Sequence, residues 1–165
     1  MSAEVQKMQR KFFQNFIDTT MNGTTPSYYR LGKDLEEFNI EMNPDTETGK
    51  NILGETTFTH NGYEVSAKAD PFYAREGDAL FEQLQTIVDT GAQYEGCATT
   101  VVEVHLWDEG TTTGTYKAYK QSCFLVPTSY GGDTSGYQIP FTITYVGEKT
   151  SGYFTPDGNG GGTFA

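Results

Sequence analysis

The sequence has few of the residues that most binding and catalytic chemistries require. Its two cysteines, Cys97 and Cys123, form no metal-binding motif, and we expect them to be reduced core thiols on neighbouring strands. Lys and Arg number 11 against 22 Asp and Glu, whereas proteins that grip nucleic-acid backbones cluster their basic residues. No apolar run approaches the length of a membrane span, and charged residues interrupt the N-terminal stretch. These shortages argue against a duplex-binding protein, a membrane-binding protein and a secretory leader.

Catalytic and cofactor motifs are also scarce. No Gly-x-Ser-x-Gly motif occurs, and the glycine-rich run at 158–162 precedes no helix that could receive a phosphate. The run at 43–54 begins like a calcium loop but lacks the glycine and the terminal glutamate in register. His105 and Glu103 share one face of a predicted strand, which permits a general base with an orienting carboxylate. We expect no catalytic residue, no cofactor and no metal site, and a hydrolase built on His105 is the weakest alternative.

The residues that are abundant favour a β-rich protein. The chain has 19 glycines and 14% aromatic residues, and its net charge is −11. Glycine and threonine favour short strands joined by tight turns, while Tyr and Phe bury large areas in a core. The stretch at 56–70 predicts a β-hairpin with Asn61-Gly62 as its two-residue turn. The stretch at 78–89 predicts one amphipathic helix, which begins near Asp78 and ends before Gly91.

Period-two alternation predicts the remaining strands, since alternate strand residues face one side of a sheet. They are expected at 28–31, 35–42, 99–107, 115–126, 137–146 and 151–154. Pro140 lacks a donor for the sheet, so its strand is expected at an edge or with a bulge. The predicted fold class is mainly β: a β-sandwich or small barrel with one flanking helix.

The N-terminal region predicts a separate helical arm. Over residues 4–18, one stripe of the helix carries Val5, Met8, Phe12 and Phe16, which we expect to contact a partner surface. The predicted organisation is an arm and linker at 1–26, a β domain at 27–155 and a flexible glycine-rich tail at 156–165.

Several blocks in order carry a family resemblance: YYRLGKDLEE at 28–37, EMNP at 41–44, KNILGE at 50–55, DPFYAREGD at 70–78 and PTSYGGD at 127–133. Together they resemble the major tail tube proteins of tailed phages and prophages of Gram-positive bacteria, over about 28–154. The resemblance implies a β-sandwich or barrel with one flanking helix. It also implies a structural virion protein that forms stacked hexameric rings, assembled in the bacterial cytoplasm, through which DNA passes during ejection. Tail terminator, baseplate or tape-measure proteins are its implied partners.

The resemblance also assigns roles to residues. The long loop at 43–54 is implied to reach a neighbouring subunit or ring, through Asn43, Pro44, Asp45, Glu47, Lys50, Asn51, Ile52 and Leu53. An acidic lumen that repels phosphate is implied for Glu37, Glu41, Glu64 and Asp70, and an ordinary solvated sheet face is the alternative.

Alternatives remain open at this point. Such proteins commonly begin near the block at 28, so the preceding arm could lock rings together, bind a tail chaperone or sheath, or mark the tube of a contractile bacteriocin-like particle. The rival class is a carbohydrate-binding or adhesin module, because 11 Tyr, 11 Phe and one Trp could supply rings that stack on sugars.

Overall fold

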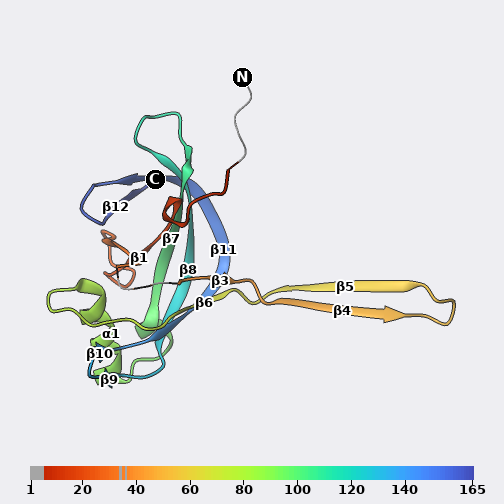
Figure 1. Ribbon diagram of the computed structural model, residues 1–165, viewed down its shortest axis with the longest axis horizontal. Coiled ribbons are helices and arrows are strands. Elements are labelled where there is room, and N and C mark those ends of the chain that lie inside the picture. The colour runs from red at the N-terminus through yellow and green to blue at the C-terminus, as the bar shows by residue number, and fades with distance from the viewer. Residues whose placement is uncertain (1–5, 34, 36) are drawn as a thin grey trace.

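The computed structural model describes residues 6–33, 35 and 37–165. Over this range the chain is mainly β, as the sequence predicts, and it contains one α-helix (Figure 1). The strands are β1 (Phe13–Asp18), β2 (Tyr28–Arg30), β3 (Ile40–Glu41), β4 (Pro44–Lys50), β5 (Thr56–Tyr63), β6 (Ser66–Ala69), β7 (Ala98–Glu109), β8 (Tyr116–Pro127), β9 (Gly131–Asp133), β10 (Gly136–Gln138), β11 (Phe141–Pro156) and β12 (Gly162–Phe164). The helices are α1 (Ala79–Thr90) and the 3-10 turns η1 (Arg10–Phe12) and η2 (Tyr94–Cys97).

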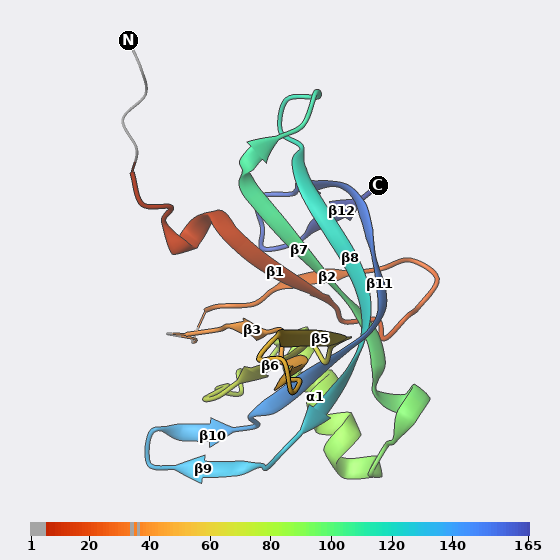
Figure 2. The same cartoon turned by 90° about the vertical axis from the view of Figure 1, so that its right-hand side faces the viewer.

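Eight of the described strands form one antiparallel sheet. Its order is β2-β1-β7-β8-β11-β6-β3, and β12 pairs with β11 beside this path. The long strands β7, β8 and β11 bend strongly (Figure 2). Register shifts interrupt β7 between His105 and Glu109 and β11 between Val146 and Thr150, as expected because a bulge bends a strand.

Hydrophobic residues pack on both faces of this sheet. One cluster lies between the sheet and α1, and includes Ile17, Val101, Leu125 and Ile143. A second cluster on the opposite face lies near β12 and includes Val102. Burial on both faces explains why the central strands contain continuous apolar runs.

The helix predicted at 4–18 is wrong over its described part. Residues Phe13–Asp18 form β1, which pairs with the edge strand β2 on one side and with β7 on the other. Phe16 packs in one cluster and Ile17 in the other, so both faces of β1 are buried. Residues buried on opposite faces of a strand can imitate the spacing of a helix, and pairing in the sheet overrides that local signal. The predicted separate arm is therefore partly a core strand.

Helix α1 confirms the prediction at 78–89. Asp78 caps it, because its carboxylate accepts hydrogen bonds from the backbone N–H groups of Leu80 (2.9 Å) and Phe81 (3.4 Å). Gly91 ends it in the left-handed conformation with φ of 63°. The buried face presents Leu80, Leu84 and Ile87 to the sheet. The helix covers one side of the sheet at the end away from β12 (Figure 2).

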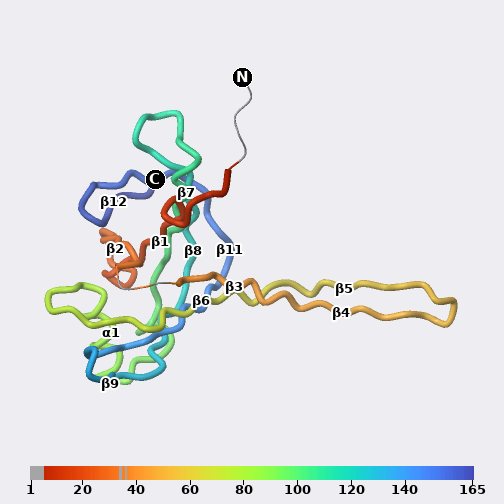
Figure 3. Tube along the Cα trace, viewed as in Figure 1, coloured from red at the N-terminus to blue at the C-terminus, as the bar shows by residue number. Residues whose placement is uncertain are grey.

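The hairpin predicted around Asn61-Gly62 is wrong in its turn and its partner strands. Strand β5 continues through this dipeptide and pairs with β4, and the turn lies at 51–55. Gly62 does have a positive φ, 113°, as the dipeptide predicts. It lies near the end of strand β5, however, and not in a turn. The stretch at 43–54, predicted as a loop, therefore forms one arm of a long hairpin that extends away from the sheet (Figure 3).

Three further strand predictions are corrected. The stretch at 137–146 is divided between β10 and β11, with Pro140 between them. The strand predicted at 151–154 and most of the one predicted at 137–146 belong to one continuous β11, which has a bulge between Val146 and Thr150. The described part of 35–42 forms a strand at Ile40–Glu41 alone. The tail predicted to be flexible folds back as β12, and the N–H of Ala165 donates to the carbonyl of Tyr153 (2.9 Å).

Candidate functional site

The β4–β5 hairpin is the most exposed element that the structure describes. Every residue of β4 is exposed, and so is every residue of β5 except Gly62. With seven and eight residues in its strands, the hairpin extends about 25 Å from the sheet. Seven of the eight residues predicted to contact a neighbouring subunit lie in this hairpin, and the eighth, Asn43, lies at its base.

Hydrogen bonds at both ends give the hairpin a defined shape. At its base, the side-chain amide of Asn43 donates to the carbonyl of Glu64 (3.0 Å) and to the hydroxyl of Ser66 (3.1 Å). At its turn, the side-chain oxygen of Asn51 accepts from the N–H groups of Leu53 (2.9 Å) and Glu55 (3.0 Å). Such local side-chain bonds stabilise turns, so the tip is structured before it meets any partner.

Apolar side chains lie at the tip without cover from their own chain. Ile52 is 102% exposed and Leu53 is 76% exposed, and Phe58 along β5 is 66% exposed. A contiguous exposed apolar patch usually marks an interaction surface. An isolated two-stranded hairpin is also only marginally stable in water. The hairpin therefore exposes apolar side chains and has no core of its own to support it.

The acidic residues predicted for a lumen fall on the outer side of β3 and β6. Glu37, Glu41 and Asp70 line one open cavity of about 440 Å³, together with Lys68. Lys68 forms an ion pair with Asp70 at 3.5 Å. Glu64 lies between β5 and β6 and does not line this cavity. The structure thus brings three of the four predicted acids together.

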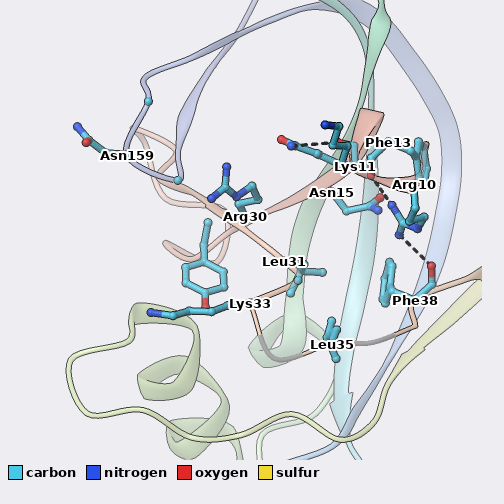
Figure 4. Close-up of a pocket in the computed structure, with 15 residues that line it drawn as sticks. Arg10, Lys11, Phe13, Asn15, Arg30, Leu31, Lys33, Leu35, Phe38 and Asn159 are labelled. Carbon is cyan, nitrogen blue, oxygen red and sulfur yellow. Dashed lines mark hydrogen bonds between the residues drawn. The ribbon is translucent and has the colours of Figure 1, made fainter. Parts of the chain in front are cut away.

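A second cavity has the opposite charge. It measures about 650 Å³ and lies among β1, β2, the segment after β2 and the turn at 158–160 (Figure 4). Its basic residues are Arg10, Lys11, Arg30 and Lys33, and none of its described lining residues is acidic. We call it the basic pocket. No local sequence pattern predicts this pocket, because its members are far apart in the chain and only the fold brings them together.

A partly buried polar cluster lies beside the aromatic side chains of β7. Glu103 is 9% exposed and forms an ion pair with Lys149. Burial, with the charges of nearby Cys123 and Glu103 in support, raises the pKa of Tyr145 well above its usual value. The hydroxyl of Tyr145 has no hydrogen-bond partner among the described residues. Of the pair considered for a hydrolase, Glu103 pairs with Lys149, and His105 stacks on Trp107 with ring centroids 4.5 Å apart.

The cysteines are free and buried, as predicted for core thiols, but Cys97 lies in η2 and not on a strand as expected. Burial raises the pKa of the Cys123 thiol to about 12, and it also raises the pKa of Cys97. Among the described residues, no group of three or more His, Cys, Asp or Glu side chains could hold a metal ion. None of the helices in the described ranges is long and apolar enough to cross a membrane.

The residues predicted for the N-terminal arm are distributed differently. Phe16 is 1% exposed in the core, Phe12 is half-buried, and Met8 is 58% exposed. Val5 lies outside the described residues. Met8 and Phe12 thus stay available for a partner, whereas Phe16 is used inside the sheet.

Comparison with known proteins adds no family assignment. No protein-family model matches the chain, and no curated protein matches it significantly.

Proposed function

We propose that this chain is the subunit of a tail tube: a structural virion protein that self-assembles into stacked hexameric rings through which DNA passes during ejection. The observation that supports it most is the β4–β5 hairpin, which is fully exposed, apolar at its tip and held in one shape by Asn43 and Asn51. Such an element has little use in a monomer, since it contributes nothing to the core and exposes apolar surface.

A hairpin that docks on a different surface of the next subunit would form a head-to-tail contact, which is the kind of contact that builds rings and stacks of rings. We take the surface that receives the hairpin to be a different one on the body of the next subunit, since the hairpin projects away from the sheet (Figure 3). Contacts between two different surfaces generate closed rings or open filaments, whereas a two-fold dimer pairs one surface with itself. A tube of stacked rings contains both: the subunits close into a ring, and the rings stack into an open filament.

Charge supports passage of DNA without adhesion. Six copies would multiply the net charge of −11 sixfold, and the acidic cavity of Glu37, Glu41 and Asp70 gives that charge one place on the surface. Phosphates are repelled by a wall of like charge at short range. We assign these acids, with Glu64, to the lumen. The chain is proposed to act without catalysis or cofactor, with terminator, baseplate or tape-measure proteins at the ends of the tube.

One observation favours a different class, a glycan-binding adhesin module. Phe13, His105, Trp107 and Tyr119 form a continuous aromatic cluster on β1, β7 and β8, with ring centroids between 4.5 and 6.4 Å apart. Trp107 is 46% exposed, so one ring of the cluster faces solvent as a sugar-stacking platform would. This cluster does not explain the hairpin, and we rank the function second.

Electron microscopy of the concentrated protein tests the proposal against its rival. The tail tube predicts rings or tubes roughly 80–100 Å across, from six domains of this size around a DNA-wide bore. Replacing 44–63 by a short turn should leave a folded monomer that forms no tubes. A protein that stays monomeric at every concentration and binds immobilised glycans through Trp107 would contradict the tail tube and support the adhesin.

A further inference from the structure

We infer that the basic pocket receives the tip of the β4–β5 hairpin from a second copy of this chain. The inference rests on the proposed self-assembly and names the receiving surface, which neither the sequence nor the comparisons assign.

The pocket has the lining that an apolar, acidic peptide tip requires. Its floor includes Phe13, Leu31 and Phe38, of which Leu31 is 9% and Phe38 is 6% exposed. Arg10 is fixed at one side, since its guanidinium donates to the carbonyl of Phe38 (3.0 Å) and to that of Phe13. A volume of about 650 Å³ lies within the range of pockets that bind drug-sized ligands, which leaves room for the side chains of a hairpin tip.

Charge at the rim is unusual for this chain. Lys11, Arg30 and Lys33 are exposed around the pocket, and no ion pair joins them to another described residue (Figure 4). Together with Arg10 they are four of the chain's 11 basic residues, gathered at one site of a protein with net charge −11. Positive charge concentrated in this way repels itself, so it favours an acidic occupant.

A buried hydrogen-bond acceptor inside the pocket also favours a peptide occupant. Asn15 lines the pocket and is 2% exposed, and its side-chain oxygen has no hydrogen-bond partner among the described residues. A buried polar atom without a partner costs free energy, and native structures usually satisfy it. A peptide tip brings backbone N–H donors, which a simple inorganic anion lacks.

The hairpin tip matches these properties. Ile52 and Leu53 are the apolar pair, and Glu55 follows them after Gly54. The hairpin residues 44–63 contain three acids and one lysine, so they carry a net charge of −2 opposite the basic pocket. The hairpin points away from its own sheet, while the pocket lies between β1 and β2 on the body (Figures 1 and 4). The occupant must therefore be the hairpin of another copy.

Disulfide trapping tests the contact directly. L53C and K33C place one thiol at the tip and one at the pocket rim, on separate preparations that carry different tags. The native thiols should not compete, because Cys97 is 5% and Cys123 is 1% exposed. Mixing the two variants under mild oxidation should yield covalent dimers that contain one copy of each. L53C mixed with T111C, which is exposed on the β7–β8 connection, is the matched control and should give at least about tenfold less dimer.

Charge exchange gives a second, independent readout. E55K and the pair R30E/K33E should each raise the protein concentration needed for assembly about tenfold, while the two changes combined should return it to within about threefold of the unmodified chain. Assembly with equal trapping at Lys33 and Thr111, and no compensation between the charge changes, would overturn the pocket assignment and leave the tail tube standing. An unmodified chain that never assembles would contradict both.

Discussion

Removing the apolar side chains at the hairpin tip should strongly weaken assembly without affecting the fold. In the double variant I52S/L53S, two side chains that are 102% and 76% exposed lose their apolar atoms. Exposed substitutions of this kind change the free energy of unfolding by about 0.5 kcal/mol or less. The melting temperature of the monomer should therefore stay nearly constant.

The expected loss in assembly follows from the area that these side chains would bury. Full burial of an Ile or a Leu side chain contributes about 1.5–3 kcal/mol, so the pair contributes roughly 3–6 kcal/mol to each contact. Because about 1.4 kcal/mol corresponds to a tenfold change, the concentration needed for assembly should rise roughly 10²–10⁴-fold.

Sedimentation velocity over a concentration series measures this shift. The control is Y130S, which removes an aromatic ring that is 65% exposed on the β8–β9 connection and should leave assembly unchanged. Normal assembly of I52S/L53S at the concentration that suffices for the unmodified chain would refute the role of the tip.

Three further outcomes follow from the geometry. Asp78→Ala should lower the free energy of unfolding by about 0.5–2 kcal/mol, because two N–H groups of α1 lose their acceptor, and thermal melting should show Asp78→Ser to be milder. Cys123 has its pKa raised from 9.0 to about 12, so the stability that its neutral thiol provides is complete below pH 9 and should fall by up to about 1.4 kcal/mol per pH unit between pH 9 and 12. Urea unfolding at several pH values should show that the free energy of unfolding falls less steeply with pH in Cys123→Ala. An unchanged dependence on pH would mean that another group titrates. Glu37→Lys with Glu41→Lys should slow DNA release while tubes still form, and unchanged ejection kinetics would show that these acids do not face the lumen.

The sequence predicts those elements whose signals are local. Helix α1 has a capping residue, one apolar stripe and a terminal glycine, and all of them lie within fourteen positions, 78–91. Strands β7 and β8 have long alternating or continuous apolar runs, and they appear where the pattern places them. In both cases local preference and tertiary packing agree, which makes such predictions dependable.

The failures occur where tertiary pairing decides. Phe13–Asp18 has helical spacing, but pairing with β7 on one side and β2 on the other makes it a strand. Asn61-Gly62 is a strong turn signal, yet the turn lies at 51–55, where Asn51 supplies the bonds. Two threonine-rich runs flank that turn, at 46–48 and 56–59, and their β preference was the signal that could have located the hairpin.

The candidate sites divide in the same way. The hairpin residues were predicted because they are contiguous in sequence, even though their secondary structure was not. The basic pocket was missed because Arg10, Asn15, Arg30 and Lys33 come from separate segments that only the sheet brings together. A site assembled by packing has no signal in a single sequence, whereas a projecting element has one.

Hydrogen exchange of the β4–β5 amides, compared between monomer and assembled particle, tests the proposed assembly element most directly. The hairpin should exchange rapidly in the monomer, since its bonds are exposed on both faces and no core supports them. In the particle the amides at 44–63 should become protected by at least about a hundredfold, while those of β8 stay unchanged. Equally rapid exchange of the hairpin in monomer and particle would contradict its role as the element that joins one subunit to the next.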